Sequence, residues 1–233
     1  VDHSAGLRLN GALSIAETKG RWQELQRQAT TAQLYDVDVR ILDKNQIKKD
    51  YPIVNTDDVI GGILMPGDGA ADPSGVTHML AKAARMEGAK IFEKSPVEEI
   101  ITKGGKISGV KVNGQTIDCE YIVLASGMWS RQIGEKAGVS IPLYPAEHFY
   151  IITEPIENLS KTLPTIRDFD NRTYIKEDAG KILVGIFEGN SIPAWDKTNK
   201  VPEDFSFGEF QENFDHFEPY LTSAIKRFPV LET

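Results

Sequence analysis

The feature that most constrains the fold of this chain is a repeated strand-and-turn pattern in its middle. The strand candidates 97–101, 107–112 and 116–124 are separated by Lys103-Gly-Gly105 and by Asn113-Gly114. Asn-Gly is a strong hairpin signal, because both residues tolerate the positive φ of a two-residue turn. The pattern therefore predicts a three-stranded antiparallel meander. Its last part, Tyr121-Ile-Val-Leu124, is continuously apolar, which is typical of a strand buried on both faces.

A helix is predicted just before this meander. Asp72 is an N-cap residue, and Pro73 follows at the first helical position. One helix face then carries the apolar residues Val76, Met79, Leu80 and Ala83. Gly88 ends the helix, and Lys90-Ile-Phe92 reads as a strand. A helix followed by a strand favours an α/β layer.

The outer parts of the chain predict a different arrangement. Before the helix, the pattern indicates a strand at 13–16, a helix at 21–32 capped by Thr18, a helix at 44–50 and a strand at 59–65. After the meander come a short helix from Ser130, strands at 149–153, 172–176 and 181–187, a turn at Ala179-Gly180, and a helix at 209–228 bent near Pro219. The residues alone thus predict a soluble α/β protein with a mixed, largely antiparallel sheet.

Charge and cysteine content exclude several classes of function. The formal net charge is −8, which argues against a nucleic-acid partner, because phosphate binding needs a basic surface. Cys119 is the single cysteine, so no intrachain disulfide forms. No apolar run is long enough to cross a membrane, and we expect no membrane insertion. The chain opens at Val1 without a methionine, which we expect of an internal fragment.

Three places in the sequence are candidates for chemistry. Ala125-Ser126-Gly127 follows the apolar strand, where small residues let a ligand approach the backbone, although a plain turn explains them too. His148 precedes a strand and could transfer a proton, or simply form a hydrogen bond there. Tyr174, in the middle of a strand, is a candidate phenol donor or a packed aromatic residue. The sequence has no dinucleotide glycine motif, phosphate loop or zinc-spaced Cys/His cluster.

Several longer strings, read together, resemble one family. They are Gly61-Gly-Ile-Leu-Met-Pro-Gly-Asp-Gly69 with Asp72-Pro-Ser, Leu124-Ala-Ser-Gly-Met-Trp-Ser-Arg131 with Gly138-Val-Ser-Ile-Pro-Leu143, Pro145-Ala-Glu-His-Phe-Tyr150 with Thr153, Leu163-Pro-Thr-Ile-Arg-Asp168, Tyr174, Gly185-Ile-Phe-Glu188 and Arg227-Phe-Pro-Val-Leu-Glu232. Their order and spacing are similar to those of the FAD-dependent dimethylglycine/sarcosine dehydrogenases, within the amine oxidoreductases related to D-amino-acid oxidase. Each string is weak alone, whereas the collinear set covers nearly the whole chain.

The resemblance implies a fold, a cofactor and site residues. Residues 1–66 and 142–233 would form a substrate domain, and residues 67–141 would form part of an FAD-binding dinucleotide domain. FAD would contact Val97 near its adenine end, and Ala125, Ser126, Gly127 and Trp129 elsewhere. His148 and Tyr174 would be the catalytic residues beside the flavin. The substrate would be a small N-methyl amino acid, oxidised by hydride transfer to an imine and then to formaldehyde.

Parts of the family pattern have no counterpart in these 233 residues. They are the N-terminal glycine-rich turn that holds the FAD pyrophosphate, the C-terminal glycine-rich segment and the folate-binding region. We therefore expect a central fragment of a longer parent protein that by itself does not hold FAD tightly. His3 matches the family's flavin-carrying histidine only if a helix-sized gap is accepted, and the alignment without that gap gives His3 no role.

Two further hypotheses remain open beside the N-methyl amine dehydrogenase. The chain could be a catalytically silent substrate domain that binds an amino-acid-like ligand without flavin, or a relative that acts on another secondary amine. A folate domain or a separate electron acceptor is a possible partner in the parent protein. We expect a cytoplasmic location, or the mitochondrial matrix if the source is eukaryotic.

Overall fold

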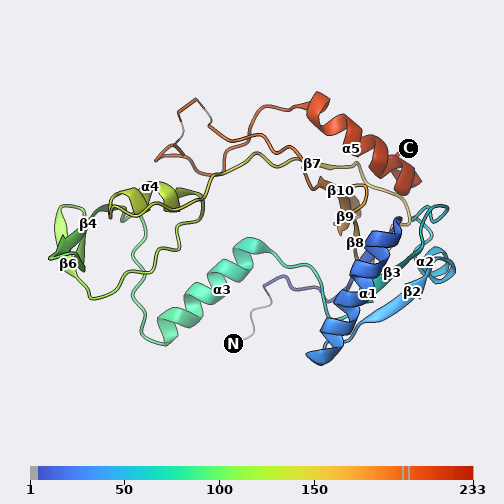
Figure 1. Ribbon diagram of the computed structural model, residues 1–233, viewed down its shortest axis with the longest axis horizontal. Coiled ribbons are helices and arrows are strands. Elements are labelled where there is room, and N and C mark those ends of the chain that lie inside the picture. The colour runs from blue at the N-terminus through green and yellow to red at the C-terminus, as the bar shows by residue number, and fades with distance from the viewer. Residues whose placement is uncertain (1–4, 196, 199, 233) are drawn as a thin grey trace. The chain divides into compact units, whose positions relative to one another are not determined.

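The computed structural model describes residues 5–195, 197–198 and 200–232, and His3 lies outside the described residues. Two compact units are present (Figure 1). The first consists of residues 1–83, 148–190 and 212–233, and the second of residues 84–147 and 191–211. Segments far apart in the sequence therefore build each unit.

A seven-stranded sheet forms the centre of the first unit, in the order β2-β3-β1-β8-β9-β10-β7. Its strands are β1 (Ala12–Ala16), β2 (Arg40–Asp43), β3 (Gly61–Met65), β7 (Tyr150–Ile152), β8 (Thr165–Asp168), β9 (Thr173–Asp178) and β10 (Lys181–Ile186). Neighbouring strands are antiparallel, apart from the parallel pair of β1 and β8. The prediction of a mixed, largely antiparallel sheet is confirmed, although β2 and β8 were not predicted as strands.

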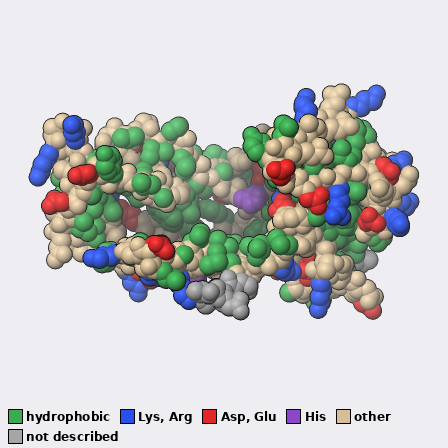
Figure 2. Space-filling model, turned by 90° about the horizontal axis from the view of Figure 1, so that it is seen from below, with side chains coloured by type: hydrophobic (Ala, Val, Ile, Leu, Met, Phe, Trp, Pro, Cys, Tyr) green, Lys and Arg blue, Asp and Glu red, His purple; other side chains and the backbone are tan. Residues whose placement is uncertain are grey.

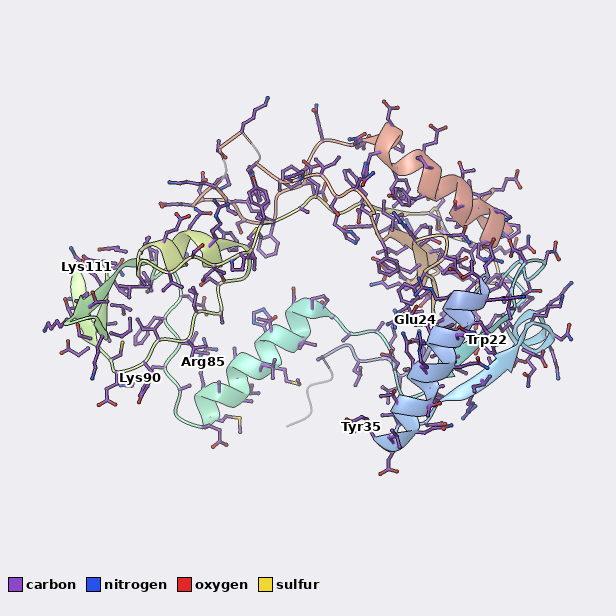
Figure 3. All side chains as sticks on the ribbon, viewed as in Figure 1. Trp22, Glu24, Tyr35, Arg85, Lys90 and Lys111 are labelled. Carbon is purple, nitrogen blue, oxygen red and sulfur yellow. The ribbon has the colours of Figure 1, made fainter. Side chains whose placement is uncertain are left out.

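One face of this sheet is partly covered by α1 (Lys19–Leu34). The Thr18 hydroxyl caps the helix by accepting a hydrogen bond from the Arg21 N–H, as predicted. Leu25 and Ala29, one turn apart, are buried against Ile63 of β3, and Trp22 packs beside them. Figure 3 labels Trp22 on this helix. Helical spacing thus places one apolar stripe of α1 on the sheet.

The opposite face of the sheet carries the main core. Every strand of the sheet contributes apolar side chains there, including Leu42 of the edge strand β2, and α5 (Phe214–Arg227) and α2 (Lys44–Asp50) cover them. The fully buried members include Leu13, Ile15, Ile47, Ile166, Ile175, Ile182, Val184, Ala224 and Phe228. Helix α5 begins five residues after the predicted start at 209, and Pro219 lies inside it near its first turn.

A buried ion-pair network fixes the end of α5. The Arg227 guanidinium donates to Asp168 on β8 (2.7 Å), to Asp58 (2.6 Å) and to Glu17 (3.2 Å). Asp168 is fully buried, and Arg227 is almost so. The charges therefore compensate one another inside the first unit, as a buried charge requires.

The second unit contains the predicted meander. Its strands are β4 (Val97–Lys103), β5 (Lys106–Val112) and β6 (Gln115–Asp118), all antiparallel. Asn113 and Gly114 make the turn between β5 and β6 with φ values of 49° and 74°. A 3₁₀ turn, η1 (Gly127–Trp129), leads into α4 (Ser130–Glu135), and another, η2 (Pro229–Glu232), follows α5 in the first unit.

Two strand predictions are wrong. Lys90-Ile-Phe92 is not a strand, and β6 ends at Asp118, so the segment 121–124 is not a strand either. Tyr121 is 86% exposed and Val123 89% exposed. An apolar segment becomes a buried strand only where neighbours supply hydrogen bonds and a covering layer. The described residues pair no strand with these two segments.

Helix α3 (Pro73–Met86) forms where the sequence predicts it but is not covered. Asp72 caps it by accepting from the Ser74 and Gly75 N–H groups, and Gly88 follows with φ of 91°. None of its residues is buried. Met79, Leu80 and Met86 of this helix are exposed. Hydrophobic side chains are visible in several places on the face drawn in Figure 2. Among the described residues, no helix has the length and apolar character needed to cross a membrane.

Candidate functional site

One half of the sheet in the first unit bears polar and aromatic side chains on the face opposite the main core. Strand register aligns Arg167 of β8, Tyr174 of β9, Gly185 of β10 and Tyr150 of β7 in a single row. Their sequence neighbours on the other face, such as Ile175, are buried in the core. Because successive residues of a strand point to opposite faces, the four residues share one face. We call this face the tyrosine row.

Gly185 determines where the Tyr174 ring lies. A Cβ atom at position 185 would stand 2.1 Å from Tyr174 Cζ and 2.3 Å from its hydroxyl oxygen. The ring therefore lies across the neighbouring strand in space that only glycine leaves open. The Phe187 ring, with its centroid 5.2 Å from that of Tyr174, packs at its side. The phenol is held in place by the strand beneath it and by one aromatic neighbour.

His148 forms a pair with Glu188. Its Nδ1 lies 2.9 Å from Glu188 Oε2, while the backbone N–H of Phe149 donates to Glu188 Oε1 at 2.9 Å. His148 precedes β7 and Glu188 follows β10, and the antiparallel pairing of these strands brings the two together. The Glu188 side chain is 6% exposed, whereas that of His148 is 50% exposed. A buried carboxylate thus supports a histidine that faces solvent.

Glu188 also acts on Tyr174. Burial raises the pKa of the Tyr174 phenol above its ordinary value, and the nearby Glu188 and Tyr150 raise it further. The phenol therefore keeps its proton at neutral pH and can donate a hydrogen bond. The structure in this way groups both predicted catalytic residues, His148 and Tyr174, around one carboxylate.

Two arginines lie at this site. Arg167, in the tyrosine row, is 3.6 Å from Asp68 Oδ2. Arg172 forms the turn before β9 with φ of 57°, and its Nη1 packs against Gly189, where a Cβ would stand 1.5 Å away. Among the described residues, Arg172 makes no ion pair. Both guanidinium groups have the geometry that binds carboxylates.

The predicted cofactor residues lie in the second unit, apart from the tyrosine row in sequence and in fold. Val97 begins β4, and its carbonyl accepts from Lys136 Nζ (3.1 Å). Ser126 precedes η1, and its carbonyl accepts from the Trp129 N–H (3.1 Å). Ala125 and Gly127 are exposed, and a Cβ at Gly127 would meet no atom within 4 Å. The backbone at 125–127 is therefore open to a ligand.

The indole N–H of Trp129 already has a hydrogen-bond acceptor within the second unit. It donates to the Pro202 carbonyl at 3.3 Å, and the neighbouring Gln132 both donates to and accepts from Val201. These bonds tie η1 and α4 to the segment 201–202. As the structure stands, Trp129 holds the second unit together, and its donor is not free for a ligand.

A dinucleotide also needs a site for its pyrophosphate, which helix N-termini commonly provide. The N-termini of α1, α2, α3 and α5 are occupied by the side chains of Thr18, Asp43, Asp72 and Asn213. Asp43 and Asp72 add negative charge that repels phosphate. The described residues therefore fit a ligand at 125–127 but do not form a complete FAD site.

The sequence analysis identified His148 and Tyr174 as candidates but assigned no role to Glu188 or Arg167. Glu188 was seen only as the last residue of the string Gly185-Ile-Phe-Glu188. Its role depends on the pairing of β7 with β10, in which Ile152 lies opposite Leu183. A hairpin rule cannot predict this pairing, because the two strands are far apart in the sequence and no short turn joins them. Arg167 was missed for the same reason, since β8 was not predicted as a strand.

Comparisons with known proteins agree on a family. A family model described as "FAD dependent oxidoreductase" matches residues 2–233. 4-Methylaminobutanoate oxidase (formaldehyde-forming) of Paenarthrobacter nicotinovorans is 34% identical over 221 residues, covering 95% of this chain and 26% of that protein. Human mitochondrial sarcosine dehydrogenase is 33% identical over 228 residues, covering 96% and 24%. The predicted resemblance is confirmed.

Another similar protein is named as a regulatory subunit and not as an oxidase or dehydrogenase. The mitochondrial pyruvate dehydrogenase phosphatase regulatory subunit of Mus musculus is 32% identical over 231 residues, covering 98% of this chain and 26% of that protein. Among solved structures, L-proline dehydrogenase from P. horikoshii has the same fold, with a TM-score of 0.81, 24% identity, and coverage of 97% and 57%. The chain spans about a quarter of the length of the curated relatives it matches.

Proposed function

The chain belongs to the DAO family of FAD-dependent oxidoreductases, and on that premise we propose that it supplies the substrate-binding part of an enzyme that oxidises N-methyl amino acids. The substrates would be dimethylglycine or sarcosine, and the products the demethylated amine and formaldehyde. The observation that carries the proposal is the grouping of His148 and Tyr174 around Glu188, next to the tyrosine row. Sarcosine dehydrogenase and 4-methylaminobutanoate oxidase among the relatives support this substrate class.

The residues of the site match the chemistry of such a substrate. An N-methyl amino acid has a carboxylate and an amine that is protonated at neutral pH, and this amine must lose its proton before oxidation. In the proposed arrangement Arg167 or Arg172 binds the carboxylate. The Tyr174 hydroxyl orients the substrate by donating a hydrogen bond, and the exposed His148 ring takes the proton from the amine.

The oxidation itself is the chemistry of FAD, the cofactor of the family. The described residues make no complete FAD site, so the roles assigned to this chain are binding, orientation and proton transfer. We propose that residues 67–141 contribute Val97, Ala125, Ser126, Gly127 and Trp129 to the cofactor side. Residues 1–66 and 142–233 would form the substrate domain, which contains the whole tyrosine row.

A second candidate function is ligand binding without chemistry. The similarity to a protein named as a regulatory subunit favours it. So do the side-chain caps on the N-termini of α1, α2, α3 and α5, which leave only the six-residue helix α4 without such a cap among the described α-helices. In that case the tyrosine row would bind an amino-acid-like ligand and His148 would not transfer a proton. A folate domain or an electron acceptor, proposed as partners of the parent protein, would then be unnecessary.

The location of the protein is likewise a proposal. Two of the relatives carry "mitochondrial" in their names. We propose the mitochondrial matrix if the source is eukaryotic and the cytoplasm otherwise.

An anaerobic titration of flavin absorbance tests the proposed function. Dimethylglycine and then sarcosine are added to the product of the complete gene and, separately, to this chain mixed with FAD. The proposal predicts that either amine bleaches the flavin of the complete product, and that Tyr174→Phe and His148→Ala slow the bleaching. A complete product that carries flavin but is not bleached by either amine would refute the substrate class and favour ligand binding without chemistry.

A further inference from the structure

The carboxylate of Glu188 uses its two oxygen atoms for two different donors. Oε1 accepts from the backbone N–H of Phe149 and Oε2 lies against Nδ1 of His148, both at 2.9 Å. Because Phe149 directly follows His148, the two bonds hold one short segment at the start of β7 from the same side. The Glu188 side chain is 6% exposed, so water does not replace either bond easily.

This arrangement determines which ring nitrogen of His148 carries a proton. An ionised carboxylate has only acceptor sites, so it binds Nδ1 only when Nδ1 bears hydrogen. In the neutral ring the lone pair then lies on Nε2. Among the described residues, no hydrogen-bond partner of Nε2 is found, and half of the His148 side chain is exposed.

We propose that Glu188 is a positioning residue that holds His148 as the Nδ1–H tautomer, with Nε2 ready to accept a proton from the substrate amine. The proposal rests on the proposed function for the identity of that amine. The tautomer itself does not depend on the substrate. Glu188 acts through His148 and need not touch the substrate.

The substitution Glu188→Gln makes the proposal testable, because the amide has nearly the same shape as the carboxylate but only one acceptor atom. The Phe149 N–H is fixed in the backbone and is always a donor, so it requires the amide oxygen. The amide NH₂ group then faces Nδ1, which must become the acceptor. Glu188→Gln should therefore move the proton of the neutral ring from Nδ1 to Nε2. If Glu188 only packed against His148, Glu188→Gln would leave the tautomer of His148 unchanged.

The matched control is Glu157→Gln. Glu157 is exposed, and among the described residues its side chain has no hydrogen-bond or ion-pair partner. This variant makes the same chemical change and the same loss of one negative charge elsewhere in the first unit. It should leave the tautomer of His148 as it is in the unsubstituted chain.

The experiment is nitrogen NMR of the full chain labelled at histidine, at an alkaline pH where the ring is neutral. The loss of one signal in His148→Gln identifies His148 among the four histidines. We expect the Nδ1–H tautomer in the unsubstituted chain and in Glu157→Gln, and the Nε2–H tautomer in Glu188→Gln. An Nε2–H tautomer in the unsubstituted chain, or an unchanged Nδ1–H tautomer in a folded Glu188→Gln variant, would overturn the proposal.

If Glu188→Gln does not fold, the spectrum of the unsubstituted chain still tests the proposal, because it shows whether His148 carries its proton on Nδ1 or on Nε2. The result of this experiment does not depend on the proposed function. Flavin that neither dimethylglycine nor sarcosine bleaches would refute the substrate class while leaving the tautomer result intact. Bleaching together with an Nε2–H tautomer would refute the role of Glu188 alone.

Discussion

In the first unit Ile166, Ile175 and Ile182 have no exposed surface, and α2 and α5 pack against the same face of their sheet. In the second unit the described buried apolar side chains are Ile100, Ala194 and Val201, while Tyr121 and Val123 are largely exposed. The units contain similar kinds of residue but differ in how many neighbours cover them. Apolar periodicity thus indicates which surface can be buried, and only the neighbouring elements determine whether it is.

The same contrast applies to function. The predicted catalytic residues lie in the first unit, where β7, β9 and β10 hold them against a rigid core. The predicted cofactor residues lie in the second unit, where the backbone at 125–127 is exposed. Sites on well-packed strands are held more precisely than sites on loops. We therefore expect the first unit to bind its ligand in a preformed geometry.

The largest expected effect comes from the buried ion pairs of the first unit. Arg227→Ala would leave Asp168 buried without its partner, and we expect a loss of about 3–5 kcal/mol in the free energy of unfolding. Fluorine NMR of fluorotryptophan-labelled chain during urea unfolding measures it, because Trp22 reports the first unit and Trp129 and Trp195 the second. The Trp22 signal should change at lower urea.

The control for this variant is Arg40→Ala. Arg40 pairs with Asp38 at 3.5 Å, and their side chains are 60% and 62% exposed. An exposed pair contributes little, so the change should be below about 0.5 kcal/mol. Equal losses in the two variants would mean that the network around Arg227 does not stabilise the first unit.

Truncating one apolar side chain in each unit sharpens the comparison. Ile175→Ala removes buried atoms from the core, and we expect a loss of about 2–5 kcal/mol. Val123→Ala removes exposed atoms, and the change should be within about 0.5 kcal/mol. Unfolding monitored by the same tryptophan signals checks both. A comparable loss for Val123→Ala would show that the segment 121–124 is packed in solution.

Replacing a glycine by alanine is expected to destabilise the two units for different reasons. Gly185→Ala would push the new methyl group into the Tyr174 ring, at a cost of about 1–3 kcal/mol, and would displace the phenol. Gly114→Ala meets open space and strains only the backbone, at a cost of about 1 kcal/mol. Only Gly185→Ala should shift the NMR signals of Tyr174. Unmoved signals would show that the ring does not lie over the glycine.

The smallest expected effect is a pH dependence of the first unit. Burial acts to raise the pKa of Asp58, but hydrogen bonds from Lys226 and Arg227 outweigh it and lower the pKa below its ordinary value. A lowered folded-state pKa stabilises the fold above the unfolded-state pKa, and this contribution is lost as pH falls through the folded-state value. We expect Asp58→Asn to flatten the loss of stability below about pH 4.

The measurement is urea unfolding as a function of pH, again with the Trp22 signal. Asp57→Asn is the matched control, since the Asp57 side chain makes none of the described ion pairs. An unaltered pH profile in Asp58→Asn would mean that this carboxylate is not held by Arg227 and Lys226 in solution.

Local features of the fold could be predicted from the sequence. Thr18 and Asp72 cap helices, and Asn113-Gly114 makes a hairpin, because each acts through bonds to residues within a few positions. Strand β8 was missed, since its pairing with β1 joins residues about 150 positions apart. The segment 121–124 was predicted wrongly because its pattern describes a buried strand without supplying the neighbours that would bury it.

The site shows the same limit. His148 and Tyr174 came from a resemblance to a family, and their proximity to Glu188 depends on the pairing of β7 with β10 and of β10 with β9. Gly185 appeared in the sequence as part of a turn-flanking strand, and its role as the space for the Tyr174 ring follows only from the register. Residue type suggested the chemistry, whereas strand order supplied the geometry.

The central claim is that the tyrosine row of the first unit binds an N-methyl amino acid. NMR of the isotope-labelled chain during a titration with sarcosine tests it most directly, with a Tyr174→Phe variant alongside. We predict that sarcosine shifts the signals of Tyr174, Gly185 and His148, leaves the meander of the second unit unchanged, and binds more weakly to Tyr174→Phe. Shifts confined to the second unit, or equal binding by Tyr174→Phe, would contradict the claim.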